Sequence, residues 1–252
     1  MNLIKLFIFL FSSIHFVTYS QQEQIKGAYF GFQYKPIIGA DYIGSSTLNL
    51  NNNSYQSTFK QTIGYSFGGI VRIPISKFIA IETGINQIKR NYIVNYQITN
   101  SILSVSKSLS FLSFDIPTNI LFFSKLSNKL FLNSALGPSF VFNPSNVASQ
   151  LVTNDSIIFK AEGRRRSIFS IELNANVGFE YRTLRNGYFY LGTSARIPFK
   201  PIFDVATMYQ VNGMKNIMIG SLNGAYVSFD FRYFFPIIEN KGIQFQKGPV
   251  DQ

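Results

Sequence analysis

The sequence predicts an all-β protein, a transmembrane antiparallel up-and-down β-barrel of about eight strands. Apolar and polar residues alternate with a period of two in about eight segments, and this is the period of a β-strand. The connections between these segments are alternately short and long, as in a barrel with short periplasmic turns and long extracellular loops. The apolar face is rich in Phe, Tyr, Ile, Leu and Val, whereas the polar face is rich in Ser, Asn and Gly.

The first twenty residues, MNLIKLFIFLFSSIHFVTYS, have the layout of a secretory signal peptide. Lys5 supplies the positive start, an apolar stretch follows, and small residues precede a cut after Ser20. We therefore expect residues 1–20 to be removed, residues 21–236 to form the barrel and residues 237–252 to form a periplasmic tail. An N-terminal anchor is the alternative, but the apolar run is short and interrupted by polar residues.

Alternation defines each segment in turn. In 27–36, GAYFGFQYKP, the aromatic residues share one face, and in 59–73 one face runs from Phe59 to Ile73. The remaining segments are 78–90, 108–123, which alternates less cleanly, 130–142, 167–182, 188–199 and 225–235. Pro117 and Pro138 interrupt strand-like runs, so we expect β-bulges there, because a closed barrel has no edge strand to accommodate proline.

The sixth segment shows why the apolar face is expected to meet lipid. In SIELNANVGFEYR the apolar face extends along the whole strand, and the polar face holds small residues that fit a tight barrel interior. Ile171 and Phe179 should therefore face lipid, and Glu172 and Glu180 should face the lumen. Aromatic residues also gather at the short-turn end, as in an interfacial girdle. A soluble protein with an aromatic core is the alternative.

The connections differ in length in a regular way. PISK, SKLSNK and TLRNG are short links, and the long polar connections cover 40–58, 91–107, 143–166 and 200–218. A spanning sheet must close on itself, because an open edge would leave unpaired backbone groups in hydrocarbon. About eight strands leave a lumen that side chains fill, whereas aqueous channels typically have about 16–18 strands.

Charges of both signs lie on the inward face, and they predict a lumen that is closed by ion pairs. The predicted network consists of Arg72, Glu82, Glu172, Glu180, Arg196, Asp230 and Arg232. If TLRNG turns the chain, Arg182 pairs with Tyr188 and Asn174 pairs with Arg196. Glu172 is then the diagonal neighbour of Arg196, and Glu180 is the second choice of partner.

Composition argues against enzyme activity. The only histidine, His15, lies in the predicted signal peptide, and the chain has no cysteine. The mature chain therefore lacks a histidine general base, a thiol nucleophile and the usual zinc ligands. Glu172 and Glu180 are roughly 27 Å apart on an extended strand, at about 3.4 Å per residue, too far to share a substrate bond. We expect no catalytic residues, no metal and no small-molecule cofactor.

Arg164, Arg165 and Arg166 form the sharpest basic feature of the sequence. They are candidates for contact with lipopolysaccharide phosphates or with an acidic partner. The alternative is a solvated loop end, or arginines that anchor the barrel at the headgroup level. The formal net charge of +11 does not indicate a nucleic-acid partner, because an exported membrane barrel would not meet one.

Several segments carry a resemblance to a known family. FLSFDIPTNILF (111–122), LFLNSALGPSFVF (130–142), VGFEYR (177–182) and FDFRYFF (229–235) resemble strands of the PorT-like outer-membrane β-barrel proteins of Bacteroidota, a porin-family barrel domain. That family includes a component of a protein secretion system. The resemblance implies an outer-membrane location and contacts with outer-membrane lipid, lipopolysaccharide and other envelope proteins.

Two functions are compatible with these features. One is a structural or interaction barrel, an accessory subunit of a secretion or outer-membrane protein assembly machine. The alternative is a porin-like barrel that transports small solutes. The small number of strands favours interaction over transport.

Overall fold

The computed structural model describes residues 28–99, 104–153, 157–183 and 185–236. The predicted signal peptide and C-terminal tail lie outside these residues. The thirteen strands are β1 (Tyr29–Gly39), β2 (Thr47–Asn51), β3 (Tyr55–Pro74), β4 (Ile79–Ile98), β5 (Ser104–Lys125), β6 (Leu130–Phe142), β7 (Val147–Thr153), β8 (Ile157–Arg165), β9 (Phe169–Thr183), β10 (Gly187–Pro198), β11 (Phe203–Val211), β12 (Met214–Leu222) and β13 (Tyr226–Phe234). In the described part of the chain, no helix has the length and apolar character needed to cross a bilayer.

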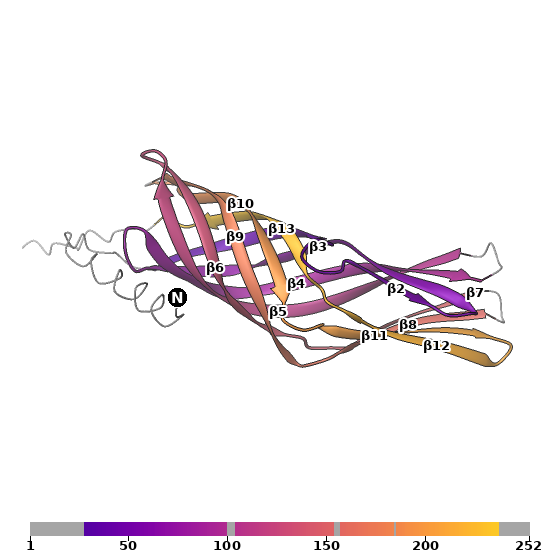
Figure 1. The fold of residues 1–252 in the computed structure, drawn as a ribbon. Helices are drawn as coiled ribbons and strands as arrows, with labels where there is room; N and C mark the ends of the chain where they lie inside the picture. Colours follow the sequence, from indigo (N-terminus) through magenta and orange to yellow (C-terminus); the bar gives the residue numbers. More distant parts are fainter. Residues whose placement is uncertain (1–27, 100–103, 154–156, 184, 237–252) are drawn as a thin grey trace, which may run out of the picture.

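Eight of these strands form a closed antiparallel barrel. The ladder runs β1-β13-β10-β9-β6-β5-β4-β3, and β3 pairs again with β1, which closes the sheet. In Figure 1 the barrel is on the left, and the remaining strands lie to the right, beyond the right-hand end of the barrel. The predicted all-β barrel of about eight strands is therefore confirmed.

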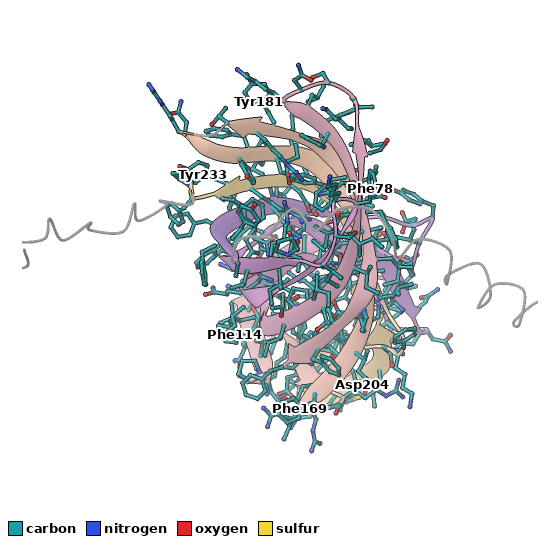
Figure 2. The ribbon with its side chains drawn as sticks, turned by 90° about the vertical axis from the view of Figure 1, so that its left-hand side faces the viewer. Phe78, Phe114, Phe169, Tyr181, Asp204 and Tyr233 are labelled. Atoms are coloured by element: carbon teal, nitrogen blue, oxygen red, sulfur yellow. The ribbon has the colours of Figure 1, made fainter. Side chains whose placement is uncertain are left out.

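The alternation places apolar side chains outside and charged side chains inside. In β9, Ile171 and Phe179 are 46% and 53% exposed, whereas Glu172 and Glu180 are fully buried. Phe78 and Phe169 point away from the barrel in Figure 2. The outer apolar surface is the one that a membrane-spanning barrel presents to lipid. Phe123, which the sequence suggests for the aromatic girdle, instead faces the interior.

The registers of β9 with β10 and of β5 with β6 can be compared with the sequence-based expectations. Arg182 pairs with Tyr188 and Asn174 with Arg196, as predicted from the TLRNG turn. The expected bulges at the prolines are wrong, because β5 and β6 keep one register from Phe114 to Lys125. The ladder between these strands lacks only the pairs just after Pro117. Proline has no N–H to donate, but its presence does not shift the register.

A bulge occurs instead in β3, between Thr62 and Tyr65. The extra residue reverses which side chains point inward along the strand. Phe59, which precedes the bulge in the sequence, is buried, whereas Phe67, which follows it, is exposed. The predicted single apolar face of 59–73 is therefore wrong, and the two ends of β3 contribute to different interiors.

The long connections are largely strands and not loops. β3, β4 and β5 continue beyond the barrel, and β2 pairs with the projecting end of β3. The connection after β6 forms β7 and β8, and the connection after β10 forms β11 and β12, which together make a sheet ordered β12-β11-β8-β7. We call this two-sheet structure the extension. Figure 1 shows its strands running out from one end of the barrel.

An apolar core holds the two sheets of the extension together. The ring of Phe111 stacks on Phe203 with centroids 3.9 Å apart, and the rings of Tyr96 and Phe159 meet with centroids 5.0 Å apart. Burial of such large apolar side chains supplies the main driving force for folding of a sheet pair. Burial also raises the pKa of Tyr96 in this core.

Candidate functional site

The barrel interior contains a continuous chain of ion pairs near the short-turn end. Lys35 lies 3.1 Å from Asp230, and Arg232 bridges Asp230 at 2.7 Å to Glu82 at 2.6 Å. From Glu82 the chain continues through Arg72, at 2.8 Å, to Glu180. The last member of this series of ion pairs is Arg182, at the mouth of the barrel, whose Nε lies 2.6 Å from a carboxylate oxygen of Glu180.

A second cluster lies further up the barrel, nearer the extension. Arg90 donates a hydrogen bond from Nη2 to Glu172 at 2.7 Å. The other carboxylate oxygen of Glu172 lies 3.5 Å from Arg196, which donates to Asp115 at 2.6 Å. Glu172 is the diagonal neighbour of Arg196 that the register predicts, whereas Glu180 belongs to the first cluster.

These charges balance within the barrel. Among the described residues, the buried charged side chains comprise five cations and five carboxylates. They are Lys35, Arg72, Arg90, Arg196 and Arg232, and Glu82, Asp115, Glu172, Glu180 and Asp230. Aromatic rings cover the guanidinium groups, for example Phe234, whose centroid lies 4.0 Å from Arg72. Because a buried unpaired charge is costly, removal of any one partner should destabilise the closed barrel.

The structure brings all seven predicted lumen residues into these two clusters and adds four others. Lys35, Arg90, Asp115 and Arg182 complete the clusters, although the network predicted from the sequence did not include them. Alternation was the available signal, since Lys35 and Arg90 fall on the polar face of their segments. Asp115 lies in the segment that alternates least cleanly, which obscured its direction.

The interior is filled from the lumen into the extension. Gly224 lies at the boundary, where a Cβ atom would be 2.3 Å from Ile202 and 3.5 Å from Nε of Arg90. Ile202 belongs to the apolar core of the extension. The ionic interior and the apolar core of the extension therefore approach each other from the two sides of Gly224.

The three consecutive arginines do not act as one cluster. Arg165 is half-buried and donates to the carbonyls of Asn143, at 3.2 Å, and of Pro144, which fixes the connection after β6. Arg164 is paired across the ladder with Asp204, and Arg166 lies 3.9 Å from the same carboxylate. Only Arg164 and Arg166 are exposed.

The closed ladder, the apolar outer surface and the charged interior define the fold as that of an outer-membrane β-barrel. No protein-family model matches the chain, and a comparison with curated proteins found no match. The chain is similar to the crystal structure of the outer membrane protein OprG from Pseudomonas aeruginosa. That similarity has a TM-score of 0.50 and 11% identity, and it covers 86% of this chain and 100% of the other. The shared fold agrees with the predicted location in the outer membrane.

The described residues contain no group of three or more His, Cys, Asp or Glu side chains that could hold a metal ion. The carboxylates of the lumen are instead neutralised by arginine and lysine.

Proposed function

We propose that this protein is a non-enzymatic interaction barrel that presents its extension to another protein of the cell envelope. The observation that carries the proposal is the filled interior, in which Arg90 and Glu172 are fully buried beneath the apolar core. A barrel filled in this way offers a scaffold for contacts rather than a path for solutes. The resemblance to PorT-like proteins supports an accessory role in secretion or in outer-membrane protein assembly.

The outer face of β11 and β12 is the surface that best fits a protein partner. Its apolar side chains are Ala206, Met208, Ile217 and Ile219, and Ile219 is 74% exposed. The opposite outer face of the extension carries polar residues, including Gln56, Thr58 and Asn95. Exposed apolar surface outside the membrane is typical of protein interaction sites.

The partner contact is tested by charging this face. We expect Ile217→Lys/Ile219→Lys to reduce the amount of co-purifying envelope protein at least about tenfold, because buried apolar anchors dominate interface energies. Lysine is tolerated on edge strands, so the barrel and the extension should still fold. The measurement is mass spectrometry of complexes purified from native membranes in mild detergent.

Gln56→Lys/Ser104→Lys is the matched control, because it adds the same charge to the opposite outer face. This control should retain the partner. Equal retention by both double variants would refute the role of β11 and β12, and a wild-type protein that purifies alone would refute the accessory role.

Deletion of 146–162, within the long connection 143–166, is a poorer test of partner contacts. The deletion removes β7 and most of β8, including Phe159 from the apolar core. It would expose the remaining core and change many surfaces at once. Substitutions on an outer face avoid this effect because they leave the core unchanged.

Transport of small solutes is the second candidate function. It is favoured by polar atoms of the lumen that have no hydrogen-bond partner in the described protein, such as Gln33 Oε1 and Asn176 Nδ2. We expect no stable, large single-channel currents from the purified protein in a planar bilayer, because the ion pairs close the lumen. Such currents would overturn the interaction proposal in favour of transport.

A further inference from the structure

The junction between barrel and extension contains a cleft on the outer wall, above the start of β9 and the end of β10. Its volume is about 340 Å³. We call it the junction cleft and define it by Arg166, Phe169, Ile171, Phe199 and Lys200. A pocket of this size is large enough for part of a small ligand.

The lining of the junction cleft is divided into an apolar part and a cationic part. Phe169, Ile171 and Phe199 are all exposed on the outer wall, and Phe169 and Phe199 are 71% and 65% exposed. Ile171 belongs to the lipid-facing row of β9. Arg166 and Lys200 lie in the links that lead into the extension, beyond the ends of the barrel strands. The cations therefore lie at the outer edge of the apolar wall.

Backbone hydrogen bonds hold the two sides of the cleft in place. The amide of Phe199 donates to the carbonyl of Ile171 at 3.3 Å, and the amide of Arg166 donates to the carbonyl of Ile202 at 3.1 Å. The first bond joins the β10–β11 link to β9, and the second joins it to the β8–β9 link. The cleft is therefore a built feature of the fold rather than a gap between independent loops.

The cations of the cleft are available to a ligand. The Nε atom of Arg166 lies 3.9 Å from the carboxylate of Asp204, and both side chains are partly exposed, so this contact is weak. Asp204 also accepts a hydrogen bond from Ser221 at 2.7 Å. No carboxylate partner of Lys200 occurs in the described ranges. The cleft thus keeps a net positive rim.

We propose that the junction cleft binds a phosphate-bearing glycolipid of the outer leaflet. Its acyl chain lies along Phe169, Ile171 and Phe199, and its phosphate contacts Arg166 and Lys200. Arginine is well suited to phosphate because its planar guanidinium forms paired, charge-assisted hydrogen bonds. The order of apolar wall and cationic rim follows the order of acyl chain and headgroup from the membrane outward.

The test measures retention of purified lipid A on the full mature protein by native mass spectrometry from detergent micelles. We expect the wild-type protein to retain phosphorylated lipid A and Arg166→Gln/Lys200→Gln to retain roughly tenfold less, because charge-assisted contacts are lost. Both proteins should bind dephosphorylated lipid A equally weakly. Inorganic phosphate should not displace the bound lipid, because it lacks the acyl chains.

Lys60→Gln/Lys215→Gln is the matched control, because it removes the same charge from exposed positions of the extension. It should retain phosphorylated lipid A as the wild type does. If the control loses as much lipid A, the effect is due to net charge alone and the proposed site is wrong. Retention by Arg166→Gln/Lys200→Gln, or displacement by inorganic phosphate, would also overturn it. The substituted side chains are exposed, so both variants should fold. Heat-dependent electrophoretic mobility checks this.

Discussion

Glu172→Ala is expected to destabilise the barrel by about 3–5 kcal/mol, because it leaves a buried charge without its partner. Arg90 is fully buried and donates to Glu172 at 2.7 Å. Without this carboxylate, the partners of Arg90 among the described residues are the carbonyl of Gly224, to which it donates a hydrogen bond, and the ring of Tyr226. Arg196 is affected less, because Asp115 remains its partner. The measurement is the urea midpoint of unfolding in detergent micelles.

Glu162→Ala is the matched control for this substitution. Glu162 is also a carboxylate in a strand paired with a basic residue, Lys160, but both side chains are partly exposed. Exposed pairs contribute at most about 1 kcal/mol, so the control should change the midpoint little. Similar midpoints for the two variants would mean that the Arg90–Glu172 pair contributes no more than a surface pair.

The sequence was sufficient to predict the barrel strands because the membrane imposes a simple rule on them. Each side chain faces either lipid or lumen, so the period of two in β9 and β10 predicts both faces, and the short TLRNG turn between them predicts the pairing of Arg196 with Asn174. The same rule selects inward charges, which explains why Glu172 and Arg232 were recognised. It does not identify which cation meets which carboxylate, because partners such as Arg90 and Glu172 are separated by many residues in the chain.

The extension was not predicted because one of its faces meets water. Tyr92, Val94 and Tyr96 share one face of β4, and the other face carries Asn91, Ile93, Asn95 and Gln97. Its three polar residues lower the hydropathy and make the segment look like a loop. One signal was available in the sequence. Asn212–Gly213 forms the turn between β11 and β12, with both residues at positive φ, and Asn-Gly between apolar runs is a strong hairpin signal.

The bulge in β3 had no comparable signal. Ile63 and Gly64 continue an apparently regular alternation, and the reversal of faces depends on how β3 pairs with β4. The prolines, by contrast, suggested irregularity where the register is continuous. Both errors have the same physical origin, because register is a property of two strands and one sequence segment specifies only its own faces.

Phe111→Ala is expected to destabilise the extension by about 3–5 kcal/mol while the barrel strands remain paired. Phe111 is 1% exposed, stacks on Phe203 and meets Tyr92 edge-on with centroids 5.7 Å apart. Its removal leaves a cavity where the two sheets of the extension meet. The ion pairs of the barrel do not involve these rings, so local opening of the extension should precede loss of the barrel.

Limited proteolysis of the purified protein distinguishes these two events. Cleavage within β7, β8, β11 or β12 should accelerate at least about a hundredfold in Phe111→Ala, because every 1.4 kcal/mol or so is a factor of ten in the open population. The heat-dependent electrophoretic mobility of the barrel should change little. Ile219→Ala is the control, since it removes an apolar side chain from the exposed face of the same extension. If Phe111→Ala and Ile219→Ala are cleaved at the same rate, the apolar core does not hold the extension together. If barrel mobility is lost together with the extension, the two parts unfold as one cooperative unit.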